Sequence, residues 1–151
     1  MENVASFVDI VTAFDIDADT KKDAISAVVS KLNTSGKLVN EKKFKEDVFA
    51  REKELPTYIG YGFGLPHSQS DYVKEATIGI GKLKHSVEWT DGKEADFIFL
   101  IAVPSGGREN MHLKILANLA RLLMHDDFRD KLRKSNEQQV QELLRESQNP
   151  S

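Results

Sequence analysis

An uninterrupted apolar segment constrains the fold more than any other feature of this sequence. Residues 97–103 read Phe-Ile-Phe-Leu-Ile-Ala-Val, with no polar side chain at odd or at even positions. Successive side chains of a strand point to opposite faces, so a strand with this sequence must be covered on both sides. The segment is also far too short to cross a bilayer as a helix. We therefore predict a central, buried strand over about residues 95–103.

Other strands and helices follow from the spacing of apolar residues. Residues 76–83 alternate as a half-buried strand does, and residues 87–89 predict a short strand before an Asp-Gly turn. Residues 68–75 are polar, which predicts a turn or a short helix. Thr20 and Asn40 are suited to cap helices. Helices are predicted over residues 20–33, 41–54, 111–124, 127–134 and 136–146. Helices at both ends with strands between them predict an α/β fold, a mixed β-sheet flanked by helices on both sides.

The composition limits the kinds of partner and the place of action. A chain of 151 residues without repeats or a linker predicts one domain spanning residues 1–151. The 21 basic and 24 acidic residues give a net charge of −3, which disfavours binding to nucleic acid. The first residues lack a basic, apolar leader, so we expect a cytoplasmic protein without direct membrane insertion. Because cysteine is absent, this chain supplies no disulfide, thiolate nucleophile or zinc thiolate.

His67 ends the sequence Gly-Tyr-Gly-Phe-Gly-Leu-Pro-His and is the strongest candidate for chemistry. Glycines let backbone N–H groups, such as those near Gly62 and Gly64, come close to a ligand, and Pro66 fixes its own φ. A histidine pKa of about 6.5 leaves one ring nitrogen unprotonated near neutral pH, so an exposed His67 is a potential nucleophile for a phosphoryl group. The alternative is a surface histidine next to a turn.

Two further residues are candidates for the same site, each with a simpler alternative. His112 begins a predicted helix, where a partly buried structural histidine is the alternative. Arg51 lies near the C-terminal end of a predicted helix, where a cation stabilises the helix dipole without any part in catalysis. His85 and His125 match no motif, and we interpret both as structural or solvated. Zinc held by His67 and His112 has no third ligand at a recognisable spacing and no His-Glu-x-x-His motif.

Four separate motifs together resemble one known family. They are Arg51-Glu52, the Gly-Leu-Pro-His ending at His67, Ala-Val-Pro at residues 102–104, and His-Leu-Lys-Ile-Leu at residues 112–116. In this order they resemble the enzyme IIA domain of the fructose/mannitol type (EIIA type-2), from the bacterial phosphoenolpyruvate-dependent sugar phosphotransferase system. The resemblance covers about residues 19–144 and is greater to the fructose group than to the mannitol group. It implies a single α/β sandwich.

The resemblance implies a phosphoryl carrier with three catalytic residues. His67 would be the phosphorylated nucleophile, with His112 beside it as a stabilising neighbour and Arg51 neutralising the phosphoryl group. The donor would be the phosphohistidine of the carrier HPr, and the acceptor a cysteine of a IIB component on a separate chain, since this chain has no cysteine. The resemblance implies no metal and no organic cofactor. The protein would be a phosphotransferase that supports uptake of a sugar, with a fructose-like sugar favoured.

A regulatory module is the alternative from another class. In the nitrogen-related branch of this family, the phosphorylation state of the same fold controls a partner protein without sugar transport. Both functions use His67, so transfer to a cysteine-bearing IIB protein separates them. A third alternative, a non-enzymatic interaction domain with a decayed site, would lack a site residue, whereas His67, His112 and Arg51 are all present.

Overall fold

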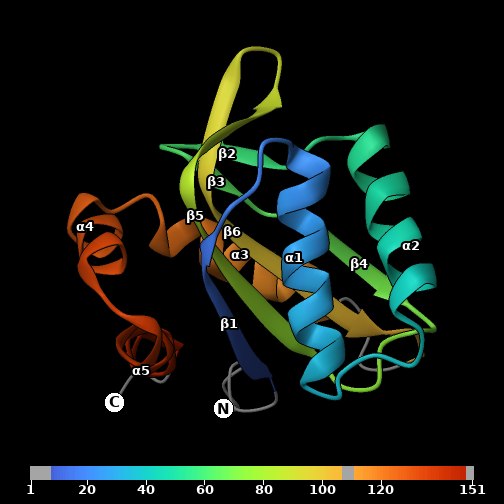
Figure 1. Cartoon of the computed structure of the whole chain (residues 1–151). Helices are drawn as coiled ribbons and strands as arrows, with labels where there is room; N and C mark the ends of the chain where they lie inside the picture. The colour runs from blue at the N-terminus through green and yellow to red at the C-terminus, as the bar shows by residue number, and fades with distance from the viewer. Residues whose placement is uncertain (1–7, 107–110, 149–151) are drawn as a thin grey trace.

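A six-stranded mixed β-sheet forms the centre of the structure, with helices against both faces (Figure 1). The computed structural model describes residues 8–106 and 111–148. The strands are β1 (Asp9–Ile16), β2 (Tyr58–Gly60), β3 (Phe63–Gly64), β4 (His67–Ser70), β5 (Thr77–Thr90) and β6 (Lys93–Pro104). The helices are α1 (Lys21–Thr34), α2 (Glu41–Glu54), α3 (Met111–Leu122), α4 (Asp126–Lys134) and α5 (Glu137–Gln148). The strand order is β1-β5-β6-β3-β2, and β4 also pairs with β6. The predicted α/β class, a mixed sheet flanked by helices on both sides, is confirmed.

Strand β6 is the central strand that the apolar segment predicts. It pairs antiparallel with β5 along one edge and parallel with β3 and β4 along the other. Every side chain from Phe97 to Val103 is fully buried. The side chains alternate between two cores: Ile98 and Leu100 belong to the core under α1 and α2, whereas Phe97 and Phe99 belong to the core under α3, α4 and α5. The strand is apolar on both faces because helices cover both faces.

Helices α1 and α2 begin at the capping residues that the sequence indicates. The Thr20 hydroxyl accepts a hydrogen bond from the Asp23 N–H at 3.1 Å, and Asn40 Oδ1 accepts one from the Lys43 N–H at 3.0 Å. These bonds satisfy backbone donors of the first helical turn. The predicted bounds of α2 agree with the structure, and those of the other four helices differ from it by one or two residues. Within the described ranges, no helix is long and apolar enough to cross a membrane.

Three parts of the strand prediction are wrong. The sequence patterns do not predict β1, an edge strand that pairs in parallel with β5 and mixes exposed and buried residues, nor the short strands β2 and β3. The two strands predicted over residues 76–83 and 87–89 form one strand, β5, whose pairing with β6 is irregular between Lys82 and Val87. The turn or short helix predicted over residues 68–75 begins instead with strand β4, because backbone pairing with β6 holds this polar segment in the sheet.

Candidate functional site

A cleft of about 590 Å³ lies between α2 and β4 and contains two of the three predicted site residues. Helix α2 contributes Asp47, Ala50, Arg51 and Glu54, which recur at the spacing of one helix face. Strand β4 forms the opposite wall with all of its residues, beginning at His67. Figure 1 shows α2 alongside β4. The structure therefore places His67 and Arg51 in one cleft.

The position of His67 follows from an interruption in strand pairing along β6. Strands β3 and β4 pair with the same edge of β6 in one register, with Phe63 opposite Phe97 and His67 opposite Ile101. Pro66 lies between the two strands and has no N–H to donate, although its carbonyl accepts from the Ile101 N–H at 2.9 Å. The chain thus passes through Leu-Pro without a change of register, and pairing resumes at His67.

The His67 side chain is buried, which corrects the expectation of an exposed residue. It is only 4% exposed. Ring atom Nδ1 lies 3.2 Å from the carbonyl oxygen of Leu65. Because a carbonyl can only accept a hydrogen bond, Nδ1 carries the proton, and the lone pair of the neutral ring lies on Nε2. The contact with Leu65 therefore selects the tautomer in which Nε2 is the nucleophilic nitrogen.

Arg51 is exposed at the C-terminal end of α2, and its carbonyl accepts from the Leu55 N–H at 3.2 Å. Among residues 8–106 and 111–148, its guanidinium forms no ion pair. The next residue, Glu52, lies on a different side of the helix and is buried. Its carboxylate accepts from the Thr57 N–H at 3.0 Å and hydroxyl at 2.6 Å and pairs with Lys21 at 2.8 Å. Arg51 therefore combines a helix-terminal position with a guanidinium that is available to an anion in the cleft.

His112 is the second residue of α3, and its side chain lies outside the described part of the structure. Helix α3 contacts both β4 and β6. The backbone of His112 therefore belongs to a helix that packs against the strand of His67. The proximity of the two imidazole rings stays a prediction.

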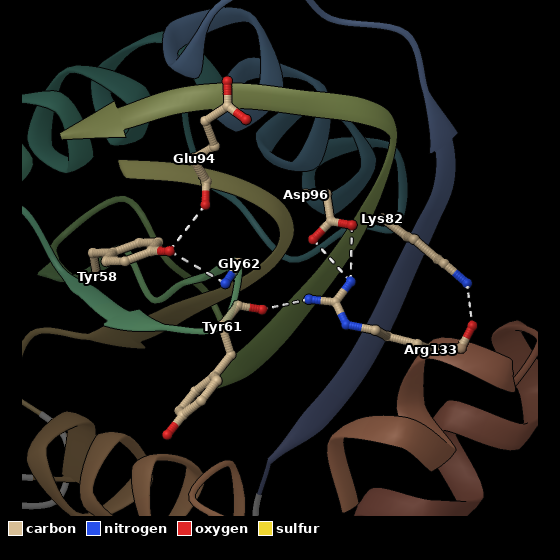
Figure 2. Close-up of polar contacts among 7 residues, drawn as sticks. All are labelled: Tyr58, Tyr61, Gly62, Lys82, Glu94, Asp96 and Arg133. Atoms are coloured by element: carbon tan, nitrogen blue, oxygen red, sulfur yellow. Dashed lines mark hydrogen bonds and ion pairs between the residues drawn. The ribbon is translucent and has the colours of Figure 1, made fainter. Parts of the chain in front are cut away.

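The glycine-rich turn before His67 does not provide the expected amides to the cleft. The Gly62 N–H donates to the Tyr58 hydroxyl at 3.3 Å, and this hydroxyl donates to the Glu94 carbonyl at 3.0 Å (Figure 2). Gly64 lies in β3, where an added Cβ would be 2.5 Å from Cε2 of Trp89. Neither glycine is among the described residues that line the cleft. The Gly62 N–H thus stabilises the turn, and the missing side chain of Gly64 leaves space for the indole ring of Trp89.

The other two histidines have no place among the described lining residues of the cleft. His85 is half exposed, and its Nε2 lies 3.5 Å from Oδ1 of Asp17. His125 precedes α4 and forms no side-chain capping bond. Over the described ranges there is no group of three or more His, Cys, Asp or Glu side chains arranged to hold a metal ion.

Asp47 and Ser70, which sequence reasoning missed, join the two walls of the cleft. Ser70 Oγ donates to Oδ2 of Asp47 at 2.6 Å and accepts from the Tyr72 N–H at 3.1 Å. Asp47 lies four residues before Arg51, so helical spacing alone was a signal that both face the cleft. No comparable local signal marks Ser70, because its position depends on the pairing of β4 with β6.

Comparison with known proteins identifies the family. The chain matches the family model described as "Phosphoenolpyruvate-dependent sugar phosphotransferase system, EIIA 2" over residues 7–147. It is 34% identical over 130 residues to the "PTS system fructose-specific EIIA component" of Haloferax volcanii, a match that covers 84% of each chain. It is 31% identical over 113 residues to "Multiphosphoryl transfer protein 2" of Escherichia coli, a match that covers 75% of this chain but 13% of that protein. The chain belongs to the EIIA type 2 family of the sugar phosphotransferase system. Members of this family are phosphoryl-carrying components of a phosphotransferase system.

Solved structures have the same fold. Nitrogen regulatory protein IIA-Ntr from Neisseria meningitidis aligns with a TM-score of 0.77 and 28% identity, covering 88% of this chain and 92% of that one. Enzyme IIA for mannitol, in its complex with phosphorylated enzyme IIB from Escherichia coli, aligns with a TM-score of 0.74 and 21% identity, covering 89% and 93%. The second likeness shows the fold alone.

Proposed function

We propose that His67 accepts a phosphoryl group from the phosphohistidine of HPr and passes it to a cysteine of a separate IIB component. The shared cleft carries this proposal: an imidazole with a defined tautomer and a guanidinium without an ion pair among the described residues line one cavity. Family membership supports the class of reaction. We further propose that His112 lies beside His67 as the third residue of the site, and that residues 1–151 form a single EIIA domain.

In the first transfer, the lone pair on Nε2 of His67 attacks phosphorus while the P–N bond of the donor breaks. The donor imidazole keeps the electron pair of the broken bond, and a new P–N bond forms at Nε2. The Nδ1 proton stays on the ring, where the Leu65 carbonyl at 3.2 Å stabilises the positive charge that the ring acquires. Arg51 stabilises the negative charge on the phosphoryl oxygens.

In the second transfer, a thiolate of the acceptor attacks the same phosphorus atom. His67 leaves as a neutral imidazole that keeps its Nδ1 proton. The sequence contains no cysteine, so the thiolate belongs to another chain. Membership of the EIIA type 2 family supports a IIB component as the acceptor. Because His67 is 4% exposed, each partner must bring its reacting group into the cleft between α2 and β4.

Sugar uptake is the proposed role, with a fructose-like sugar. Relatives from Haloferax volcanii and Bacillus subtilis are both named as fructose-specific components. Regulation of a partner protein without sugar transport is the second candidate, and the likeness to IIA-Ntr at 28% identity supports it. Transfer of the phosphoryl group to a fructose-type IIB protein is expected for the first role and not for the second.

The first experiment measures intact mass after incubation with phosphoenolpyruvate, enzyme I and HPr, under conditions that preserve acid-labile phosphohistidine. The wild type should gain one phosphoryl group, and His67→Ala should gain none. His85→Ala removes a histidine outside the cleft and should be phosphorylated as the wild type is. Arg51→Ala and His112→Ala should each slow the gain by about 10²–10³-fold, as the loss of one charge-stabilising donor does. A wild type that gains no phosphoryl group would contradict the proposal.

A further inference from the structure

We propose that Ser70 is a positioning residue that holds the Asp47 carboxylate away from Arg51 and so keeps the guanidinium available to the phosphoryl group. The inference rests on the proposed function, because it takes Arg51 as the group that binds the phosphoryl oxygens. This proposal gives a role to Ser70 and Asp47, two polar residues of the cleft that take no part in the phosphoryl transfer itself.

The spacing of Asp47 and Arg51 favours an ion pair between them. They lie four residues apart on α2, and both line the cleft. Residues at this spacing are neighbours on a helix surface, and an acid that precedes a base is in the more favourable orientation. In the part of the chain that the structure describes, however, neither side chain takes part in an ion pair. Something therefore competes with Arg51 for the Asp47 carboxylate.

Ser70 is the competing partner. Its hydroxyl has one proton, and it donates this proton to Oδ2 of Asp47 at 2.6 Å, a short bond typical of a charged acceptor. Ser70 is itself held firmly, since its hydroxyl accepts from the Tyr72 N–H at 3.1 Å and its carbonyl accepts from the Ser105 N–H at 3.1 Å. The residue is 2% exposed. The sheet therefore fixes Ser70, and Ser70 draws the carboxylate toward β4.

Two other charged residues of α2 could compete for these ion pairs: Lys43 for Asp47, and Glu54 for Arg51. Lys43 lies one helical turn earlier, and its Nζ is 5.4 Å from the centre of the Tyr72 ring. Glu54 also lines the cleft, three residues after Arg51, but an acid that follows the base is in the less favourable orientation. Of the two acids of α2 that line the cleft, Asp47 is thus the better placed to capture Arg51 once it is released from Ser70.

The variant Ser70→Ala should release Asp47 and slow phosphorylation of His67. Ion pairs on a helix surface are weak, so the captured guanidinium is withdrawn only part of the time, and the rate should fall about two- to fivefold. This loss is smaller than the loss expected for Arg51→Ala. The rate is measured with phospho-HPr as the donor, by intact mass at short times.

Rescue by a second substitution is the decisive measurement. Adding Asp47→Asn to Ser70→Ala removes the carboxylate, and an amide cannot form an ion pair with Arg51. The double variant should therefore regain the wild-type rate. Asp47→Asn alone should also keep the wild-type rate. In the background of Arg51→Ala, Ser70→Ala should cause no further slowing.

A matched control removes a hydroxyl–carboxylate bond of equal length from another side of α2. The Thr57 hydroxyl donates to Glu52 at 2.6 Å, outside the cleft. Thr57→Val should lower the midpoint of thermal unfolding and leave the rate of phosphorylation unchanged. An equal loss of rate in Thr57→Val and Ser70→Ala would assign both effects to a loosened helix and overturn the proposal.

Two other results would overturn it. If Ser70→Ala with Asp47→Asn is as slow as Ser70→Ala alone, the hydroxyl acts directly or as a link between the walls. If Ser70→Ala keeps the wild-type rate, Asp47 does not compete for Arg51, although the carrier function of His67 stands.

Failure of the carrier function looks different, because the wild type then gains no phosphoryl group. In that case the Nε–H NMR signal of Arg51 in the unphosphorylated protein still tests whether Ser70 keeps Asp47 away from Arg51. Ser70→Ala should shift this signal, and adding Asp47→Asn should reverse the shift.

Discussion

The Arg133 guanidinium donates to both carboxylate oxygens of Asp96, at 2.9 and 2.8 Å, and so joins α4 to β6 (Figure 2). The same guanidinium donates to the Tyr61 carbonyl at 2.6 Å. Tyr61 and Gly62 form the turn between β2 and β3, with φ angles of +59° and +87°. A tyrosine rarely adopts a positive φ, because its Cβ crowds the backbone. The Arg133 contacts therefore hold an unfavourable turn in the segment that leads to His67.

Arg133→Ala should lower the free energy of unfolding by about 1–2 kcal/mol, since it removes charge-assisted bonds from side chains that are about a third exposed. Arg133→Lys should recover only part of the loss, because an ammonium group cannot reproduce the planar fork. Urea denaturation measures both. Lys131→Ala changes an exposed residue of the same helix and should stay within about 0.5 kcal/mol of the wild type. Equal losses for Arg133→Ala and Lys131→Ala would contradict this account.

Gly64→Ala should destabilise the fold through overpacking against Trp89. The added Cβ would lie 2.5 Å from Cε2 of the indole, which is held by a hydrogen bond from its Nε1 to the Thr57 carbonyl at 3.1 Å. Overpacking of this kind costs about 1–3 kcal/mol in the free energy of unfolding. Trp89→Phe, added to Gly64→Ala, should cost less than the sum of the two single changes. Additive losses in a double-mutant cycle would show that the two residues do not compete for space.

Glu52→Gln should destabilise the protein because the Glu52 carboxylate is buried and fully used. It accepts two hydrogen bonds from Thr57 and pairs with Lys21 at 2.8 Å. Loss of the charge and of one acceptor should lower the free energy of unfolding by about 1–3 kcal/mol. Glu54→Gln changes an exposed carboxylate of the same helix and serves as the control, with an expected change within about 0.5 kcal/mol. A Glu52→Gln protein as stable as this control would rule out the contribution of the buried network.

Stability should depend on pH through Lys37, which lies between two carboxylates. The hydrogen bond from Lys37 lowers the pKa of Asp9, and hydrogen bonds to Asp9 and Glu75 raise the pKa of Lys37. The Asp9 contribution is therefore present above the ordinary carboxyl pKa of about 4 and is lost as the pH falls through the lowered value. The Lys37 contribution is present below its ordinary pKa of about 10.4 and is lost as the pH rises through the raised value. Both contributions are modest, because the three groups lie near solvent.

Lys37→Met should flatten both limbs of the pH profile. The measurement is the urea midpoint at a series of pH values, for the wild type and for Lys37→Met. The two curves should differ most near neutral pH and converge at the acid and alkaline ends. A constant offset across the whole range would mean that the lysine contributes through packing alone and not through its charge.

Local sequence determined the elements whose interactions are local. The strand over residues 97–103 was predictable because seven apolar side chains in succession require cover on both faces. Helices α1 and α2 were predictable because Thr20 and Asn40 cap them through bonds to residues three positions later. In the candidate site, His67 and Arg51 belong to sequence motifs, and the structure places both in one cleft.

Tertiary structure decided the elements and contacts that depend on distant parts of the chain. Strand β4 carries the polar sequence His-Ser-Gln-Ser, and its backbone pairing with β6 makes it a strand. The same packing buries His67, which the sequence had suggested to be exposed. Asp47 and Ser70 are 23 residues apart, and their hydrogen bond exists only because α2 packs against β4. Neighbouring residues encode helical and strand periodicity, so the sequence alone determined the helices and the central strand. A bond across a cleft and a strand of polar sequence depend on the packing of whole elements, so the tertiary structure decided the edge of the sheet and the environment of the site.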